Sequence, residues 1–316
     1  MEKIAFPYRS ASHLALLHVI AEAGSWEKYG LEVDYDRPIS RSDAHSAVSS
    51  GEIEFVGGNH VSTYGRQARG DNWVYLGQTV NSDPGRQLVV RADSEINSVA
   101  DLRHKTVGTS GNHPSLNDWL FLKQHGLDVD RDEIVLRKRS DEDKAAGNSG
   151  LWQQVRDGKI DAAFISPPKT LFAKRAGLKL IEIDPLPMIF FTTISSSLPF
   201  VQKHPKIVEA FIKGLIEGIH FFKTQPARAI ATIRTHYTYE GQLDDEAATL
   251  IYNSLAPALE PKLYPTPQAI ANVYLEGIRQ DKDAAKINPM ELWDLQFLRS
   301  LDNAGFGVDL YRPQPK

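Results

Sequence analysis

Arginine, histidine and hydroxyl side chains gather in short segments that follow predicted β-strands. The first segment holds Tyr8, Arg9, Ser10, Ser12 and His13, directly after the strand-like run KIAFP. A guanidinium can bind a carboxylate or sulfonate through two parallel hydrogen bonds, and backbone amides at a helix start favour an anion. Two interpretations stay open: Ser10 or Ser12 caps the next helix and Arg9 forms an ion pair, or the segment contacts a ligand.

A second segment, Ser40, Arg41, Ser42 and His45, follows the strand-like run LEVDYD. Arg41 could hold an anion as Arg9 could. Histidine titrates near neutral pH, so His45 is a candidate for proton transfer. The alternative is a capping or surface histidine on a short helix.

The third segment is the run GGNH, which holds Gly57, Gly58, Asn59 and His60. Two glycines allow a ligand to approach the backbone closely, and Asn59 and His60 supply hydrogen-bonding groups at a helix start. The alternative is that Asn59 caps the helix and the glycines serve the turn alone.

Later strand ends add further polar groups to the candidate site. Thr79 lies near the end of the strand-like run WVYLGQTV and Asn81 directly follows this run, while Ser166 and Thr192 or Thr193 are candidates for a far wall. In the expected second lobe, an amide-lined helix start before Pro114 is expected from Thr109, Ser110, Gly111, Asn112 and His113.

Several chemistries have no support in the sequence. Cysteine is absent, which removes disulfides, thiolate metal sites and thiol nucleophiles. The chain also lacks the glycine patterns that cradle nucleotide phosphates, the G-x-S-x-G elbow and the H-E-x-x-H zinc motif. We therefore expect no cofactor and no metal.

Length and charge narrow the function classes. The 316 residues exceed a common single domain, so two compact lobes or one large α/β unit are expected. The net charge of −4 without a dense Lys/Arg block gives no footprint for nucleic acid. Apolar runs stay far below the ~18 residues that span a bilayer, so no membrane insertion is expected. The start MEKIAFPYRS carries no secretory signal. It predicts a cytoplasmic protein if Met1 is the native start, and a periplasmic one if Met1 begins a trimmed chain.

Strand-like and helix-like runs alternate through the first two-thirds of the chain, which is the β-α-β rhythm of an α/β fold. The rhythm restarts near Ser98, and Phe190 to Ser197 is expected to be a strand that returns the chain to the first lobe. Beyond Pro199 the pattern predicts helices. The expected lobes are residues 1–86 plus 195–316, with a C-terminal helical cap, and residues 87–194.

Four motifs in this order resemble a known family: AGSWEKYGLEVDY, SGEIEFVGGNHVSTYGRQARG, SVADLRHKTVGTSGNHPSL and VRDGKIDAAFISPP. The stretch from Lys3 to Tyr237 is similar to the type II periplasmic-binding-protein fold, in its sulfonate-binding and thiamine-pyrimidine-synthase-like branch. One position departs from the family pattern D-L-[KR]-G-K, because His104 occupies the place of the glycine.

The resemblance implies two lobes joined by two crossings, with a ligand in the interlobe cleft and closure by hinge motion. It implies a solute-binding protein for a small organic anion or an aromatic or heteroaromatic acid, with an ABC permease as a possible partner. The alternative is a cytosolic decarboxylase or other lyase without a cofactor that acts on a small aromatic or heteroaromatic acid. In this alternative, His45 or His60 is the proton donor or acceptor, and Arg9 or Arg41 holds the carboxylate. His45 precedes the glycine pair as the catalytic histidine does in a sulfinate-cleaving relative, although that relative's cysteine is missing here.

Overall fold

The computed structural model describes residues 1–9, 11–58, 61–109, 116–138, 150–238 and 241–312. The chain forms two compact units, and each is described by itself. Unit 1 contains Met1–Asp83 and Pro187–Lys316, and unit 2 contains Pro84–Leu186. The chain therefore leaves unit 1 once and returns once.

Unit 1 is built on parallel strands with one antiparallel strand among them. β1 (Glu2–Ala5) pairs in parallel with β2 (Leu31–Asp34). Hydrogen bonds extend the pairing from β1 to β3 (Val56–Gly57): Phe55 N–H donates to Ala5 O at 3.1 Å and Gly57 N–H to Pro7 O at 3.2 Å. β10 (Pro187–Ser197) runs antiparallel to both β3 and β4 (Trp73–Ser82). The order across unit 1 is therefore β2, β1, β3, β10, β4, and the carboxyl ends of all strands except β10 share one edge.

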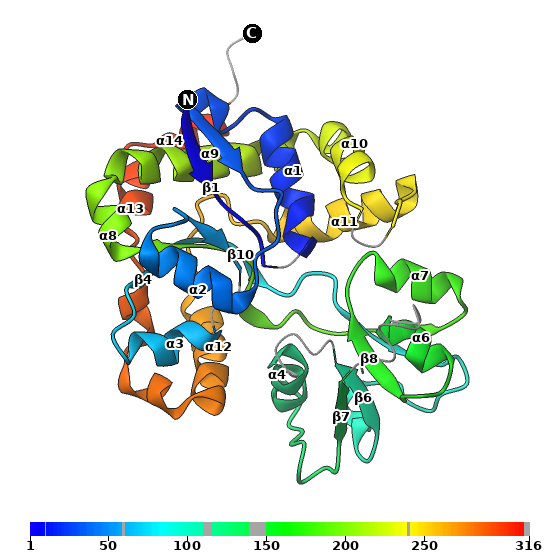
Figure 1. The fold of residues 1–316 in the computed structure, drawn as a ribbon. Coiled ribbons are helices and arrows are strands. Elements are labelled where there is room, and N and C mark those ends of the chain that lie inside the picture. Colours follow the sequence, from blue (N-terminus) through cyan, green and yellow to red (C-terminus); the bar gives the residue numbers. More distant parts are fainter. Residues whose placement is uncertain (10, 59–60, 110–115, 139–149, 239–240, 313–316) are drawn as a thin grey trace. The chain divides into compact units, whose positions relative to one another are not determined.

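Helices cover the strands of unit 1 on both faces (Figure 1). α1 and α9 pack together on the side of Phe6 and Phe55, while α3 packs against α12 on the other side. The helices of unit 1 are α1 (Leu14–Glu22), α2 (Arg41–Ser50), α3 (Val61–Gln67), α8 (Leu198–Lys203), α9 (Pro205–Thr224), α10 (Pro226–His236), α11 (Asp245–Ala258), α12 (Pro267–Gln280), α13 (Gln296–Asn303) and α14 (Phe306–Leu310).

An aromatic cluster forms the centre of the core between β1, β3 and α9. The rings of Phe55 and Phe211 stack with centroids 4.1 Å apart, and Trp26 stacks on the other side of Phe211 at 5.8 Å. α9 can approach this closely because it carries glycine where it meets Trp26: a Cβ at Gly214 would lie 2.3 Å from Trp26 Cδ1. The core thus fixes the strands whose ends carry the candidate site.

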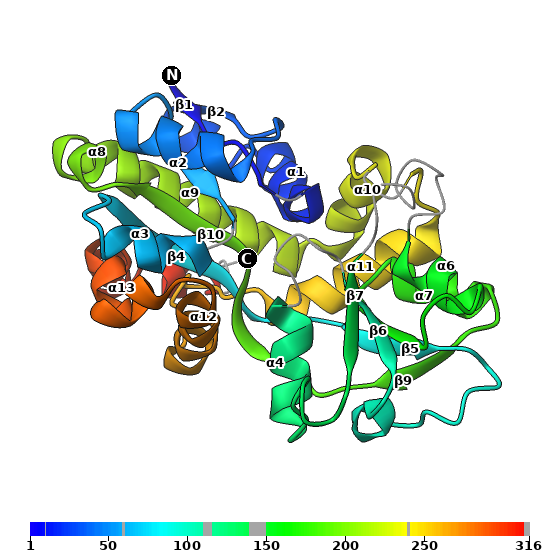
Figure 2. The ribbon, with the colours of Figure 1, turned by 60° about the horizontal axis from the view of Figure 1, so that its bottom comes forward.

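Unit 2 repeats the arrangement on a separate five-stranded sheet of order β7, β6, β8, β5, β9. Figure 2 labels β5, β6, β7 and β9 of this sheet. β6, β7 and β8 are mutually parallel, and β5 runs antiparallel to β8 and β9. The elements are β5 (Gln87–Val90), β6 (Thr106–Thr109), α4 (Leu116–Gln124), β7 (Val135–Lys138), α6 (Leu151–Arg156), β8 (Ala162–Ile165), α7 (Lys169–Arg175) and β9 (Lys179–Glu182).

The boundaries between the units lie at residues 83/84 and 186/187. Both are earlier along the chain than the boundaries expected at residues 86/87 and 194/195. The returning strand was expected to begin at Phe190, but β10 begins at Pro187, which pairs with Ser82 of β4. Because β10 stays paired with β4 to its end at Ser197, the whole strand belongs to unit 1.

Candidate functional site

The carboxyl edge of unit 1 brings four separate parts of the chain side by side. The segment after β1 lies centrally: Tyr8 N–H donates to Arg37 O at 3.0 Å on one side, and Arg9 N–H donates to Gly57 O at 3.3 Å on the other. Gly58 N–H donates in turn to Thr193 O of β10 at 3.2 Å. Of the sequence-predicted residues, the structure therefore brings together Tyr8, Arg9, Gly58 and Thr192.

Arg9 and Gly58 are in direct contact at this edge. A Cβ placed on Gly58 would lie 3.0 Å from Arg9 Cβ and 3.4 Å from its Cγ and Cδ. Gly58 also has φ = 134°, a backbone conformation that L-residues rarely adopt. The glycine thus lets the Arg9 stem lie flat on the backbone, and it fixes where the guanidinium begins.

His13 lies at the start of α1, in the short helical turn Ala11–His13, and is 5% exposed. Burial, and to a smaller extent the positive charge of Arg9, lower its pKa from 6.5 to about 3. A buried imidazole of this kind stays neutral near pH 7, so next to Arg9 it acts as a neutral hydrogen-bonding group.

Buried hydroxyl groups continue the edge on β10 and β4. Thr79 Oγ1 donates to Thr192 O at 2.8 Å, and Thr193 Oγ1 hydrogen-bonds Gln78 Oε1. Thr192 places its methyl group against Gly57, where a Cβ would meet it at 3.2 Å. Its Oγ1 is buried and has no hydrogen-bond partner among the described residues. A buried hydroxyl without a partner costs free energy, which makes Thr192 a candidate ligand contact.

Asn81 has a different role from the one that its sequence position indicated. Its Nδ2 donates to Tyr264 O at 2.8 Å, and its Oδ1 accepts from Thr266 N–H at 2.9 Å. Both ends of the amide are thus used within unit 1, and we leave Asn81 out of the candidate site. The partners come from a segment far along the chain, which the local pattern could not show.

His45 lies away from the carboxyl edge. It is 2% exposed, its ring lies 4.4 Å from the ring of Trp73, and its Nδ1 is 3.8 Å from Asp71 Oδ2. Trp73 begins β4, whereas the candidate site lies toward the other end of that strand. The structure therefore does not bring His45 together with Arg9.

The second sequence-predicted segment forms the start of α2. Arg41 is the first residue of α2, which Ser40 caps by accepting from Asp43 N–H at 3.1 Å. The remaining predicted residues lie outside the part of the chain that the structure describes: Ser10, Asn59, His60, Ser110, Gly111, Asn112 and His113.

In unit 2 the corresponding edge carries Thr109 and Ser166, at the ends of β6 and β8. Thr109 is fully buried, and its Oγ1 has no hydrogen-bond partner among the described residues. Sequence reasoning missed Arg86, which stands at the amino end of the antiparallel strand β5 and hence at this same edge. Its Nη2 lies 2.5 Å from Asp118 Oδ1, and its guanidinium lies 5.3 Å from the Phe121 ring centroid.

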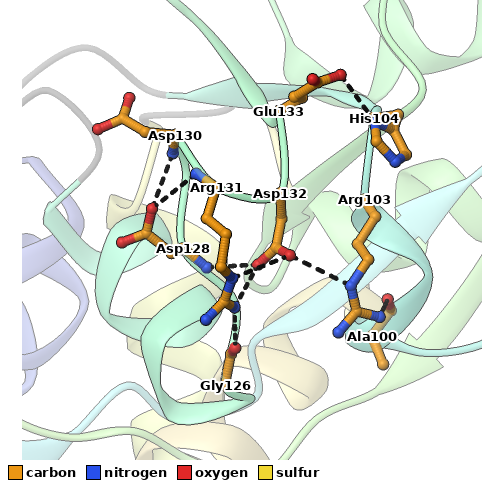
Figure 3. Close-up of polar contacts among 9 residues, drawn as sticks. All are labelled: Ala100, Arg103, His104, Gly126, Asp128, Asp130, Arg131, Asp132 and Glu133. Carbon is orange, nitrogen blue, oxygen red and sulfur yellow. Dashed lines mark hydrogen bonds and ion pairs between the residues drawn. The ribbon is translucent and has the colours of Figure 1, made fainter.

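An acidic loop of unit 2 has Asp-x-Asp-x-Asp spacing, and the carboxylates of Asp128 and Asp132 are held by contacts within unit 2 (Figure 3). Asp128 Oδ1 accepts from the N–H groups of Asp130 and Arg131 at 3.0 and 2.9 Å. Asp132 accepts from Asp128 N–H at 2.8 Å, and it pairs with Arg131 at 2.6 Å and with Arg103 at 3.3 Å. These contacts hold the pKa of Asp132 well below its usual range. Asp128 and Asp132 therefore hold the loop together, and Asp132 also ties it to Arg103.

The sequence model of the NMT1/THI5 like family matches residues 12–229, and the chain belongs to this family. A search of curated proteins finds no match. No helix in the described part of the chain has both the length and the apolar character needed to cross a membrane.

Solved structures share the fold at low sequence identity. A putative periplasmic sulfonate-binding protein SsuA of Methylobacillus flagellatus KT is 15% identical with a TM-score of 0.69, over 100% of this chain and 98% of that one. The alkanesulfonate-binding protein SsuA of Xanthomonas axonopodis pv. citri, bound to MOPS, is 16% identical with a TM-score of 0.67, over 93% and 99%. The desulfurization enzyme DszB is 13% identical with a TM-score of 0.64, over 96% and 99%. The expected periplasmic-binding-protein fold and family resemblance are thus confirmed.

Proposed function

We propose that the protein binds a small organic anion, such as a sulfonate or an aromatic or heteroaromatic carboxylate, at the edge formed by Tyr8, Arg9, Gly58 and Thr192. The observation that carries the proposal is the contact of Arg9 with Gly58 in a row of hydrogen-bonded strand ends. A guanidinium carries five N–H donors in a fork that matches carboxylate and sulfonate oxygens, so protein contacts and a ligand can share it.

The surroundings of Arg9 support an anion over a cation. His13 is neutral because of its burial, so it adds no charge but can still donate or accept one hydrogen bond. Thr192 offers a buried hydroxyl on the far side of Gly57. Tyr8 adds a phenol whose pKa is raised, first by burial and second by Asp36, so it remains a neutral donor.

Two of the similar solved structures are described as sulfonate-binding proteins, one of them from an ABC transporter. We therefore also propose that this protein is the periplasmic solute-binding component of an importer and works with an ABC permease. Neighbouring genes for a permease and an ATPase, together with an upstream coding stretch for a secretion signal, would support this role. Neighbours with catabolic functions would contradict it.

The test begins with a thermal-shift screen of alkanesulfonates, aromatic acids and pyrimidines, followed by calorimetry on each hit. Arg9→Gln should weaken anion binding about tenfold to a hundredfold, because a charged hydrogen bond is lost. Arg37→Gln is the matched control: Arg37 lies on the adjacent segment, is exposed and pairs with Asp34 at 2.9 Å. Equal losses of affinity in both variants would contradict the proposed site.

The contribution of unit 2 is measured separately. Thr109→Val removes a buried hydroxyl at constant size, and Ser166→Ala removes a hydroxyl at the end of β8. If these residues contact the ligand, each substitution should weaken binding by about threefold to tenfold. Unchanged affinity in both variants would confine the site to unit 1.

The enzymatic alternative predicts chemical change in the bound ligand. Its candidates are His45, which is buried against Trp73, and His60, which lies outside the described residues. We favour binding because His45 is not at the edge that holds Arg9. Recovery of an altered ligand by mass spectrometry, abolished by His45→Ala, would overturn this preference.

A further inference from the structure

The two strands that connect unit 1 to unit 2 are fastened to the same helix. β4 ends at Ser82, just before the chain enters unit 2, and β10 begins at Pro187, just after it returns. Asn81 near the end of β4 holds Tyr264 O and Thr266 N–H, in the segment that leads into α12. Asn272, within α12, donates from Nδ2 to Pro187 O at the start of β10.

Neighbouring residues of α12 hold the groups that contact β4 and β10 in place. Thr266 is the N-cap residue of α12 and accepts from Ala269 N–H at 3.4 Å, so Asn81 binds the helix at its first turn. Gln268 Nε2 donates to Asn272 Oδ1 at 3.1 Å, which orients the Asn272 amide with its NH₂ group toward Pro187. Both fastening side chains are therefore held in one orientation.

Backbone hydrogen bonds fix the same segment along β4. Gln78 N–H donates to Leu263 O at 2.8 Å, and Glu260 N–H donates to Thr79 O at 2.8 Å. The residues before α12 thus run beside the last part of β4, and Asn81 extends this pairing with a side chain. Asn81 is 7% exposed, so losing its partners would leave buried polar groups unsatisfied.

The ladder between β4 and β10 ends where these contacts end. Pro187 is opposite Ser82, and Pro84 and Pro185 stand in the connecting segments just beyond this pair. Proline has no N–H to continue a ladder. The backbone ladder and the side-chain contacts both stop at Ser82 and Pro187. We therefore expect the two segments that connect the units to bend just after Ser82 and just before Pro187.

We infer that Asn81 and Asn272 are positioning residues that clamp both connecting strands to α12 and so limit how far the two units move relative to each other. The clamp itself does not depend on a ligand. Its effect on binding rests on the proposed function: loosening the clamp should speed ligand dissociation more than it slows association.

Hydrogen exchange on the ligand-free protein tests the clamp directly. In Asn81→Ala, Asn272→Ala and the double variant, amides of residues 79–82 and 188–190 should exchange about tenfold faster, while amides of β1 stay unchanged. Asn253→Ala is the matched control, because Asn253 is an exposed asparagine on α11. Unchanged exchange at the strand ends in all three variants would overturn the inference.

A distance measurement provides the second test. The chain has no cysteine, so Lys174→Cys in unit 2 and Lys203→Cys in unit 1, both exposed, accept a fluorophore pair. The clamp predicts a broader spread of energy-transfer efficiencies in the asparagine variants than in Asn253→Ala, and an unchanged spread would contradict it. Should Asn81→Ala fail to fold, Asn272→Ala and Asn272→Asp, at a half-buried position, carry the test.

Ligand kinetics separate this inference from the proposed function. In the clamp variants, which keep Arg9 unchanged, we expect the ligand to dissociate faster than from the wild-type protein. If no anion binds but exchange and distance spread change as described, the clamp stands and the proposed function fails. If an anion binds through Arg9 but exchange and distance spread do not change, the proposed function stands and the clamp fails.

Discussion

The side chain of Arg9 packs against the backbone of Gly58: a Cβ placed on Gly58 would lie only 3.0 Å from Arg9 Cβ. Gly58 also has φ = 134°. Gly58 thus meets two requirements: it adopts a backbone conformation that favours glycine, and it lets the positively charged Arg9 side chain of the candidate site pack closely.

Replacing Gly58 with alanine should therefore reduce both stability and anion affinity. We expect Gly58→Ala to cost about 1–3 kcal/mol of unfolding free energy from backbone strain, and to lower anion affinity at least tenfold by moving Arg9. Gly70→Ala is the control for strain alone, because Gly70 has φ = 91° but a Cβ there would meet nothing within 4 Å. Urea unfolding and calorimetry provide the measurements. Equal affinity in Gly58→Ala and Gly70→Ala would contradict the packing role.

The burial of His13 predicts acid sensitivity. Its pKa falls from 6.5 to about 3, chiefly through burial and further through Arg9. Between these values the unfolded chain binds a proton that the native state excludes. The unfolding free energy is therefore unaffected by this proton above about pH 6.5. It decreases as the pH falls from 6.5 toward 3, by up to about 1.4 kcal/mol per pH unit.

Urea midpoints measured from pH 4 to 7 check this prediction. His13→Gln should flatten the slope over this range, because glutamine fills the position without a titrating group. A wild-type slope in His13→Gln would show that His13 titrates normally.

Gly214 and Gly218 of α9 should not tolerate alanine. A Cβ at Gly214 would lie 2.3 Å from Trp26 Cδ1, and one at Gly218 would lie 2.6 Å from two side-chain carbons of Ile20. Each substitution should lower the unfolding free energy by about 1–3 kcal/mol through overpacking, although alanine favours helix by about 1 kcal/mol. Gly307→Ala, in α14 with its nearest neighbour at 3.8 Å, should instead raise stability. Chemical denaturation distinguishes these outcomes, and a stabilised Gly214→Ala would show that Trp26 can move aside.

His104 occupies the glycine position of the family pattern D-L-[KR]-G-K, and its φ of 60° shows why glycine suits this position. Its N–H donates to Asp132 O at 2.9 Å, and its ring lies 3.0 Å from Glu133 Oε2 in an exposed pair. A left-handed backbone conformation destabilises a non-glycine residue by about 1–2 kcal/mol. An exposed pair such as His104 with Glu133 offsets little of this cost.

His104→Gly should therefore stabilise the protein by about 0.5–1 kcal/mol, after part of the gain is lost to the greater freedom of the unfolded chain. His104→Ala keeps the strained backbone and loses the Glu133 contact, so it should lower stability by about a few tenths of a kcal/mol. Thermal and urea unfolding of the two variants test this. A more stable alanine variant than glycine variant would show that backbone strain is not the determining factor.

The sequence by itself determined the α/β class, the order of the elements and the candidates at strand ends. These features are local: alternating apolar patterns set strands and helices, and parallel strands bring their carboxyl ends to one edge. Tyr8, Arg9 and Gly58 could be predicted as candidates for this reason, because each follows such an end, whereas Thr192 lies within the antiparallel strand β10.

Only the tertiary structure decided which polar residues are used by the fold and which remain candidates for a ligand contact. Asn81 had the right position for a ligand contact, but its partners near α12 lie more than 180 positions further along the chain. Arg86 was missed because its partner Asp118 lies on a different element, and the neutrality of His13 follows from burial that no local pattern encodes. Side-chain partners and desolvation depend on distant packing, and they determine the chemistry that each residue can perform.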